Sequence, residues 1–424
     1  MMTPPDARGE SRAYPARAET TRPKVSYFNS MTNNHSTRRG FLRTVGSATL
    51  GLTLSRSVGA RASRPRELLL YVGTYTAGKS EGIYVYRMDL STGALKLSGS
   101  VKADNPSFLA VDGRRRYVYA VNEVTDFDGR PSGAVSAFSI DQATGNLRFL
   151  NQQPSLGGAP CYVSVARGGR FVLVANYVGG NVSVLPVRPN GELGKATDVA
   201  QHQGSGANAE RQDAPHAHSV VLDQANRFAF AADLGIDRVM VYRFDARRGL
   251  LTPNKPHWFQ TKAGAGPRHF TFHPNGRHAY VINELDSTIT ALSYEQARGR
   301  LGEVHTVSTL PPGFSGANTC ADVHLDPSGS FLYGSNRGHD SIVVFKLERD
   351  TGRLRYVEHV STAGKTPRNF TIDPTGGFLL AANQNSDTIV TFRRDAATGR
   401  LRPAGHVAEA PSPVCLELIP AFPK

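Results

Sequence analysis

Cysteine is scarce in this sequence, and its scarcity excludes several kinds of site. Only three cysteines, Cys161, Cys320 and Cys415, occur in 424 residues. An odd number at such wide spacing is not a disulfide framework, and no Cys-x-x-Cys or Cys/His pair has the spacing of a zinc site. We therefore expect three buried thiols that pack as small apolar side chains and that form no zinc site.

Clustered positive charge and a membrane-length apolar run are also missing. Residues 1–62 hold ten of the 49 Lys and Arg residues and three of the 35 Asp and Glu residues, so the rest of the chain carries a net charge of only +7. No run of five basic residues occurs, which argues against nucleic acid as a partner and leaves a mild attraction for small anions. The apolar residues 45–54 are too few to span a membrane.

The segment before residue 63 has the order of an export signal. Arg38 and Arg39 precede Gly-Phe-Leu, residues 45–54 are apolar and small, and a small-x-small pattern ends at Ala62. This arrangement resembles a twin-arginine (Tat) signal. We predict an N-terminal extension and signal peptide over residues 1–62 with cleavage near Ala62, recognition by the Tat export machinery, and a periplasmic or otherwise exported mature protein.

The start of translation is a separate question, because two methionines are candidates. Residues 1–30 are polar, rich in Pro and Arg, and have no periodicity. Met31 stands at a normal distance from the paired arginines for a signal of this kind. We expect translation to start at Met31 rather than at Met1.

What the sequence has in abundance is a repeated β pattern. Seven times, alternating apolar residues are followed by a short turn and by Gly-x-Leu or a close variant. The separations of 46 to 58 residues are typical of a repeat architecture, and each segment is typical of a β-hairpin whose glycine takes a positive φ. The turn glycines are Gly93, Gly145, Gly191, Gly249, Gly299, Gly352 and Gly399.

A second pattern of two strands lies between these hairpins, for example at residues 106–122. Two strands and two strands make the four-stranded blade of a propeller. Six copies of the second pattern are complete, and its two halves stand at opposite ends of the chain. We therefore predict an all-β, seven-bladed β-propeller over residues 63–424, monomeric, in which the C-terminal strand at 414–419 pairs with residues 68–72 and closes the ring.

Residues that recur in every blade belong to the scaffold, so function is expected where equivalent positions differ. An Asn ends the second strand in five copies, and Asp233 takes its place in another; we expect these side chains to hydrogen-bond at strand ends. The first and second strands of a blade run antiparallel, so the start of one and the end of the other meet on one rim of the channel. The charged and histidine residues of these columns are Glu123, His218, Arg268, His269, Glu284, Asp322, Arg337 and Arg368.

Such a cation-rich rim suits a small anionic ligand, because guanidinium groups bind carboxylate or phosphate with two hydrogen bonds. Glu284 or His218 could act as a general base on water, and an arginine could stabilise an oxyanion. A purely structural interpretation stays open: Arg268 and Glu284 could simply pair, and His218 or the nearby His216 could be a structural histidine.

The chain resembles the seven-bladed lactonase family, which includes the propeller-type 6-phosphogluconolactonases and the fungal carboxy-muconate lactonising enzymes. The resemblance extends over about residues 66–420. It is carried by Tyr-Val-Gly-Thr-Tyr-Thr at 71–76, Pro-His-Ala-His-Ser at 215–219, Gly-Pro-Arg-His at 266–269, Val-Ile-Asn-Glu at 281–284 and Ser-Asn-Arg at 335–337.

The resemblance implies hydrolysis of a small anionic or sugar lactone at one end of the central channel, without a metal or any other cofactor. An export signal does not fit the cytoplasmic phosphogluconate step, so the lactone stays open. A non-catalytic periplasmic binding propeller and a muconate-type cycloisomerase are the alternatives, and loss of activity with a chelator would point to a metal-dependent lactonase. The catalytic candidates are His218, Arg268, Glu284 and Arg337, and the substrate-binding candidates are His216, His269, Arg368 and Glu123.

Overall fold

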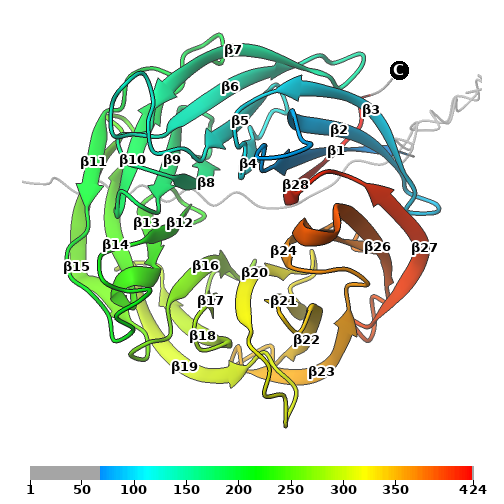
Figure 1. Cartoon of the computed structure of the whole chain (residues 1–424). Helices are drawn as coiled ribbons and strands as arrows, with labels where there is room; N and C mark the ends of the chain where they lie inside the picture. Colours follow the sequence, from blue (N-terminus) through cyan, green and yellow to red (C-terminus); the bar gives the residue numbers. More distant parts are fainter. Residues whose placement is uncertain (1–66, 423–424) are drawn as a thin grey trace, which may run out of the picture. The chain divides into compact units, whose positions relative to one another are not determined.

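The structure, a computed structural model, describes residues 67–422, and these form seven sheets of four antiparallel strands around a centre (Figure 1). This confirms the predicted all-β propeller with seven blades. The predicted signal peptide, its cleavage site near Ala62 and both candidate start methionines lie outside the described residues. Among residues 67–422, no helix is both long and apolar enough to cross a membrane.

Each blade is named by its place along the chain, with its strands given from the centre of the ring outwards. Blade 1 contains β28 (Pro413–Pro420), β1 (Glu67–Thr74), β2 (Gly82–Asp89) and β3 (Leu95–Lys102). Blade 2 contains β4 (Leu109–Val111), β5 (Tyr117–Asn122), β6 (Ala134–Ile140) and β7 (Leu147–Pro154). Blade 3 contains β8 (Pro160–Val165), β9 (Phe171–Asn176), β10 (Asn181–Pro186) and β11 (Asp198–Gln201).

The other four blades follow the same plan. Blade 4 contains β12 (Ala217–Leu222), β13 (Phe228–Asp233), β14 (Arg238–Asp245) and β15 (Leu250–Gln260). Blade 5 contains β16 (Pro267–Phe272), β17 (His278–Asn283), β18 (Thr288–Glu295) and β19 (Arg300–Ser308). Blade 6 contains β20 (Thr319–Leu325), β21 (Phe331–Arg337), β22 (Ser341–Leu347) and β23 (Leu354–Ser361). Blade 7 contains β24 (Pro367–Ile372), β25 (Phe378–Asn383), β26 (Thr388–Arg394) and β27 (Leu401–Glu409). A single 3₁₀ turn follows β13 (η1, Leu234–Ile236), and another follows β25 (η2, Gln384–Ser386).

The ring closes where the two ends of the described chain meet in blade 1. Strand β28 pairs antiparallel with β1, with Leu68 opposite Pro420 and Val72 opposite Leu416. The innermost strands contact one another in the cyclic order β28, β4, β8, β12, β16, β20, β24 and back to β28. The predicted pairing of the C-terminal strand with the first blade is confirmed, and it leaves β1 hydrogen-bonded on both sides.

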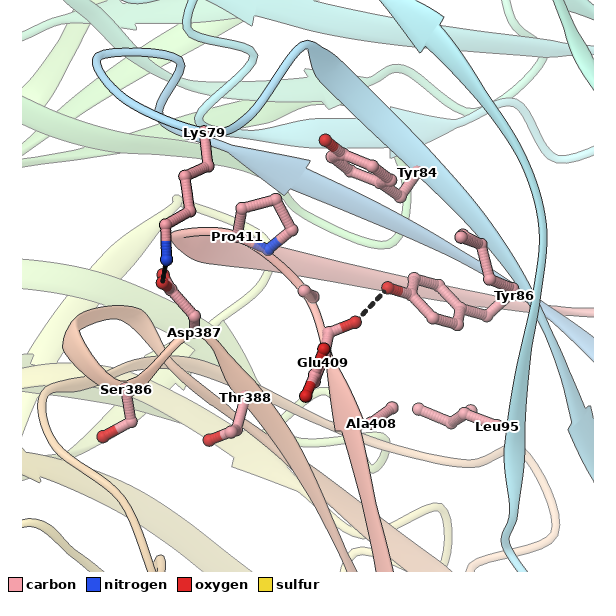
Figure 2. A pocket seen from close by; sticks show the side chains of 12 residues that line it. Lys79, Tyr84, Tyr86, Leu95, Ser386, Asp387, Thr388, Ala408, Glu409 and Pro411 are labelled. Atoms are coloured by element: carbon pink, nitrogen blue, oxygen red, sulfur yellow. Dashed lines mark hydrogen bonds and ion pairs between the residues drawn. The ribbon is translucent and has the colours of Figure 1, made fainter.

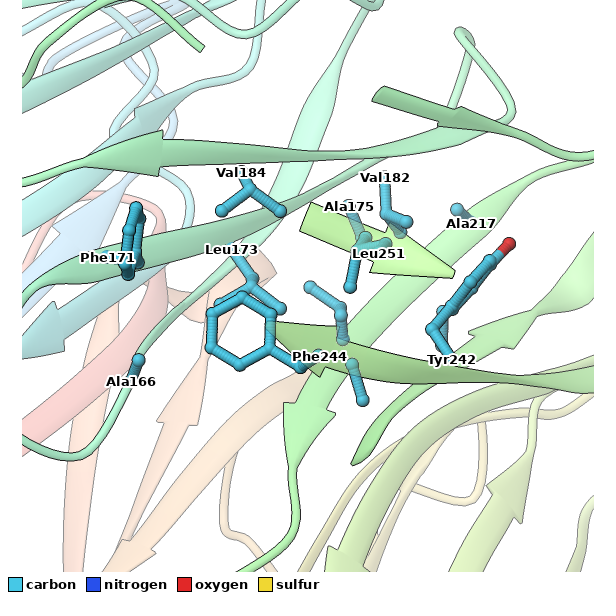
Figure 3. Packing of buried hydrophobic residues seen from close by; sticks show 13 residues of the cluster. Ala166, Phe171, Leu173, Ala175, Val182, Val184, Ala217, Tyr242, Phe244 and Leu251 are labelled. Atoms are coloured by element: carbon cyan, nitrogen blue, oxygen red, sulfur yellow. The ribbon is translucent and has the colours of Figure 1, made fainter. Parts of the chain in front are cut away.

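The hydrophobic core lies between neighbouring blades rather than at the centre. Figure 3 shows one such layer, in which Phe171 and Leu173 of β9 and Val184 of β10 meet Phe244 of β14 and Leu251 of β15. Because both faces of each sheet are covered by neighbouring blades, a middle strand such as β9 is buried along its whole length. Burying each large apolar side chain contributes about 2 kcal/mol.

The turn glycines allow close packing between blades in addition to supplying the backbone conformation of the turn. All seven have positive φ, between 62° and 89°, which confirms the sequence prediction. At Gly399 an added Cβ would lie 2.3 Å from the ring of Phe331 in the neighbouring blade, and the Gly399 carbonyl accepts a hydrogen bond from the Tyr333 hydroxyl at 2.8 Å. Each turn therefore needs glycine both for its conformation and for close packing of one blade on the next.

Replacing Gly399 by Ala should lower the free energy of unfolding by about 3 kcal/mol, because backbone strain and overpacking add together. Gly405 offers a matched control: its φ is +81° and no atom lies within 4 Å of an added Cβ. Gly405→Ala should therefore show only the smaller cost of strain, about 1 kcal/mol. Chemical denaturation of the two variants measures the difference, and equal losses would contradict the packing role.

Candidate active site at the ends of the innermost strands

A β-bulge occurs at the start of the innermost strand in blade after blade. The pairing register shifts between Pro160 and Tyr162, and equivalent shifts occur in β12, β16, β20 and β24. A bulge leaves a residue outside the ladder and turns its side chain away from the regular alternation. In blades 3, 4, 5 and 7 the bulged residues are Cys161, His218, Arg268 and Arg368.

A polar cavity of about 250 Å³ lies over these strand ends. Five of the eight predicted residues line it, whereas Arg268 and His269 lie buried outside the lining and His216 packs behind Tyr177. The structure thus brings the eight predicted residues close together, but they lie at different depths relative to the cavity. The lining residues are Glu123, Cys161, Tyr177, Arg211, His218, Glu284, Thr319, Arg337 and Arg368.

Glu284, which follows β17, is surrounded by three guanidinium groups. Its Oε2 lies 3.0 Å from Arg268 Nε and 2.9 Å from Arg337 Nη2, and its Oε1 accepts a hydrogen bond from Arg211 Nη2 at 2.8 Å. Both carboxylate oxygens are therefore occupied by cations. Charge-assisted bonds of this kind are about twice as strong as neutral ones.

These neighbours determine the protonation states in this half of the cavity. Burial favours the neutral acid, but the charges of Arg337 and Arg268 and the bond from Arg211 outweigh it and hold the pKa of Glu284 at about 2. Burial, together with the charges of Arg337 and Arg368, lowers the pKa of Arg268 to about 10. At neutral pH Glu284 is a carboxylate and Arg268 is still a cation, so neither group changes its charge near pH 7.

The other half of the cavity contains a cation with no carboxylate bound to it. The Tyr75 hydroxyl donates to Glu123 at 3.0 Å, and the guanidinium carbon of Arg368 lies 5.2 Å from the centre of the Tyr75 ring. Within residues 67–422, Arg368 has no hydrogen bond or ion pair through its guanidinium, and Arg337 Nε is buried without an acceptor. Arg368 therefore has hydrogen-bond donors to offer a ligand, whereas Arg337, which lines the same cavity, already binds Glu284 and the Cys320 carbonyl through Nη2.

His218 is buried at the wall of the cavity, between aromatic rings and a thiol. Its Nδ1 lies 3.6 Å from Cys161 Sγ, and its ring contacts Tyr177 and His269 edge-on. Burial, reinforced by the charges of Arg268 and other cations, lowers the pKa of His218 well below 6.5, so its imidazole is neutral at pH 7. Burial also raises the pKa of the Cys161 thiol, which excludes it as a thiolate nucleophile at neutral pH.

His216 supports the wall rather than lining it. Its ring stacks on Tyr177 at 4.4 Å with an angle of 9°, and its Nδ1 lies 3.0 Å from the Tyr177 carbonyl oxygen. Its Nε2 lies 3.5 Å from Asp213 on the preceding loop. Of the two histidines in this motif, only His218 reaches the cavity.

Arg211 is a site residue that reasoning from the repeat missed. It stands on the connection between β11 and β12, in a stretch that no other blade has, and its side chain is 39% exposed. It also donates to the Tyr177 hydroxyl at 3.4 Å. The one available signal was the separation of 58 residues between Gly191 and Gly249, the longest in the series, which indicates an insertion at this point.

A larger pocket, of about 750 Å³, lies elsewhere, between blade 1 and blade 7. Figure 2 shows its walls, where Tyr86 donates a hydrogen bond to the Glu409 carbonyl at 2.6 Å and Lys79 reaches Asp387 at 3.8 Å. That ion pair is largely exposed, and no cluster of buried titratable groups accompanies it. The buried titratable groups therefore lie at the smaller cavity and not at this larger pocket. In the described part of the chain, no three His, Cys, Asp or Glu side chains are arranged to hold a metal ion.

Comparison with known proteins supports one family. Residues 69–418 match the family model described as lactonase, 7-bladed beta-propeller. The chain is 41% identical over 303 residues to the 6-phosphogluconolactonase of Bacillus subtilis strain 168, an alignment that covers 71% of this chain and 83% of the relative.

Solved structures give the same result. A periplasmic gluconolactonase of Pseudomonas aeruginosa superposes with a TM-score of 0.80 and 37% identity, covering 84% of this chain and all of the other. A putative 6-phosphogluconolactonase of Bacteroides fragilis superposes with a TM-score of 0.78 and 36% identity, covering 84% of this chain and 98% of the other.

Proposed function

The chain belongs to the seven-bladed β-propeller lactonase family, and on that premise we propose that it hydrolyses a sugar lactone to the corresponding aldonic acid in the cavity at the channel mouth. One observation supports placing the reaction in this cavity. The polar cavity over the innermost strands combines a neutral histidine, His218, with Arg337 and with Arg368, whose guanidinium binds no carboxylate within residues 67–422. A base and an anion-binding group are the two parts that hydrolysis of an ester carbonyl needs.

The reaction follows from the positions of these groups. His218 takes a proton from a water molecule as the water oxygen attacks the lactone carbonyl carbon. Arg337 and Arg368 stabilise the oxyanion that forms. The tetrahedral intermediate then expels the ring oxygen, which recovers the proton from His218, and the product ionises to a hydroxy-carboxylate at neutral pH. No step is assigned to a metal.

Glu284 has a different role from the one that the sequence suggests. A carboxylate with a pKa of about 2 and with cations on both oxygens is a poor base. We assign it the task of holding Arg211, Arg268 and Arg337 in place. Without it, three like charges would repel one another in a buried site.

The function is tested directly with purified protein and a panel of sugar lactones, phosphorylated and unphosphorylated. We expect ring opening well above the spontaneous rate for at least one class, with the rate unchanged by a chelator. Ligand-induced thermal stabilisation without turnover would instead support a binding propeller. A product isomeric with the substrate, rather than hydrated, would support the cycloisomerase alternative.

Replacing Arg211 by Ala tests the loop contribution to this site. Its side chain lines the cavity but is partly exposed, so it should contribute to binding more than to the chemical step. We expect KM to rise about tenfold, the equivalent of about 1.4 kcal/mol, with kcat nearly constant. The neighbouring exposed Glu210→Ala on the same loop serves as the control and should leave both constants unchanged.

We further propose that the mature protein acts outside the cytoplasm. The support is the signal-like segment before residue 63 and the similarity to a protein described as a periplasmic gluconolactonase. N-terminal sequencing of the exported form should find cleavage near Ala62. A variant with Arg38→Lys and Arg39→Lys should stay in the cytoplasm, and unchanged export of that variant would contradict a Tat route.

A further inference from the structure

Beneath the cavity lies a buried polar network that the proposed reaction does not use. Asp322, in the bulge of β20, accepts hydrogen bonds at Oδ1 from His269 Nδ1 at 2.7 Å and at Oδ2 from His324 Nε2 at 2.8 Å and Asn369 Nδ2 at 2.5 Å. These residues come from the innermost strands of blades 5, 6 and 7. Asp322, His269 and Asn369 are all buried.

The direction of the bond between His269 and Asp322 is fixed by a neighbour. Arg268 Nη1 lies 3.0 Å from His269 Nε2, and a guanidinium nitrogen can only donate. His269 Nε2 must therefore be an acceptor, so a neutral ring carries its proton on Nδ1, which donates to Asp322. Burial and the charge of Arg268 lower the pKa of His269 to about 4, so the ring is neutral at pH 7.

The bond between Asn369 and Asp322 is fixed in the same way. Asn369 Oδ1 accepts a hydrogen bond from the Leu416 backbone N–H at 2.8 Å, so its amide NH₂ group faces Asp322. Both oxygens of Asp322 thus meet donors whose orientation is set by other groups. Burial opposes ionisation, but His324 and His269 outweigh it and hold the pKa of Asp322 well below its usual range.

We propose that Asp322 is a positioning residue for the reaction: it fixes the tautomer of His269, and His269 Nε2 in turn holds Arg268 against Glu284. This inference rests on the proposed function. Arg268 binds Glu284 through Nε, His269 through Nη1, and the Ala321 carbonyl at 2.5 Å through the same Nη1. Of the three arginines around Glu284, Arg268 is the one whose guanidinium also binds a histidine ring.

An amide side chain at position 322 cannot replace the carboxylate in this setting. In the Asp322→Asn variant the new NH₂ group would face either His269 Nδ1–H or the NH₂ group of Asn369, and in each case two donors would meet. If His269 changed tautomer to relieve the conflict, its Nε2–H would face Arg268 Nη1.

Exchanging the two side chains removes the conflict with His269 and Asn369. The amide NH₂ group at position 322 then also faces His324 Nε2, and the His324 ring, which is 41% exposed, can accept there in the neutral tautomer that carries its proton on Nδ1. A carboxylate at position 369 can accept hydrogen bonds both from the Leu416 backbone N–H and from the amide NH₂ group placed at position 322. The amide oxygen at position 322 is then free to accept the hydrogen bond from His269 Nδ1, so the tautomer of the parent protein is kept.

The test compares Asp322→Asn, the exchanged double variant Asp322→Asn with Asn369→Asp, and Asp373→Asn. Asp373 is a matched control, since it is buried and binds only backbone and hydroxyl donors of its own turn. We expect Asp322→Asn to lower kcat about 30-fold with little change in KM, and the double variant to recover to within about threefold of the parent. Asp373→Asn should lose stability without losing kcat per folded molecule.

Full activity in Asp322→Asn, or a folded double variant no better than the single one, would overturn the proposal. An inactive parent would instead mark failure of the proposed function. In that case ¹⁵N NMR of the histidine rings still decides the network: the parent should show His269 protonated on Nδ1, and Asp322→Asn should change that pattern. An unchanged tautomer in a folded variant would also overturn the positioning role.

Discussion

Replacing Glu284 by Gln is expected to lower kcat/KM by about a thousandfold, the largest loss of any single change at this site. The glutamine amide keeps the shape but removes the charge that three guanidinium groups share, at distances of 2.8 to 3.0 Å. Its NH₂ group must also face one of them, donor against donor. Arg211, Arg268 and Arg337 would then move apart, and the anion-binding geometry would be lost with them.

The same variant should be less stable by about 3 to 5 kcal/mol, because it leaves buried cations without their partner. The sign of the pH dependence follows from the depressed pKa of Glu284. Its contribution to stability is complete above the pKa of about 4.3 that it has in the unfolded chain, and it is lost as the pH falls through about 2. The difference in free energy of unfolding between parent and variant should therefore shrink between about pH 5 and about pH 2.

Glu358→Gln is the control for both measurements, since Glu358 also pairs with an arginine, Arg400, but far out on the rim of a blade. It should cost less than about 1 kcal/mol and leave kcat/KM unchanged. A Glu284→Gln enzyme that keeps more than a tenth of the parental kcat/KM would contradict the role assigned to this carboxylate.

Replacing His218 by Gln is expected to lower kcat by about two to three orders of magnitude, because the general base is removed. In the parent, the acid limb of the rate profile should lie well below pH 6.5, since burial and the charge of Arg268 keep the imidazole neutral. The variant should lack this limb. His406→Gln, on the outer strand β27, is the control and should leave the profile unchanged.

The pH at which this acid limb lies also depends on a residue other than His218. Arg368 is one of the charges that lower the pKa of His218, so Arg368→Gln should raise this pKa and shift the acid limb towards pH 6.5. The variant should also bind substrate more weakly, because Arg368 keeps free donors in the cavity. Measuring kcat and kcat/KM across the acid and neutral range separates the two effects. An acid limb that does not move would show that another group controls it.

Much of the fold was predictable because each blade repeats the same physical requirements. A turn glycine such as Gly399 recurs wherever a hairpin needs a positive φ, and the two unmatched half-patterns predicted the pairing of β28 with β1. The recurrent Asn is a strand-end hydrogen bonder as predicted: Asn383, for example, donates to the Thr362 carbonyl. The close packing of each turn glycine on the next blade was not predictable, because it depends on the distance between blades.

Five of the eight predicted residues line the cavity, so the membership of the candidate site was predictable in part, whereas the depth of each side chain was not. Arg268 and Arg368 occupy the same column, and the bulge places both at strand starts, yet Arg368 lines the cavity and Arg268 lies outside the lining. The difference arises from contacts of Arg268 with Glu284 and His269, which an alignment of repeats does not contain. Arg211 could not be predicted from an alignment of the repeats, since it has no counterpart in any other blade.

The pairing of β28 with β1 also sets the order of events during synthesis. The strand that completes the first blade, Pro413–Pro420, follows every other strand of the propeller along the chain, so it leaves the ribosome after all of them. Until then, β1 carries an unpaired edge that can capture other chains. A chain that stops before this strand can never close its ring, so the last strand acts as a check that the whole propeller has been translated.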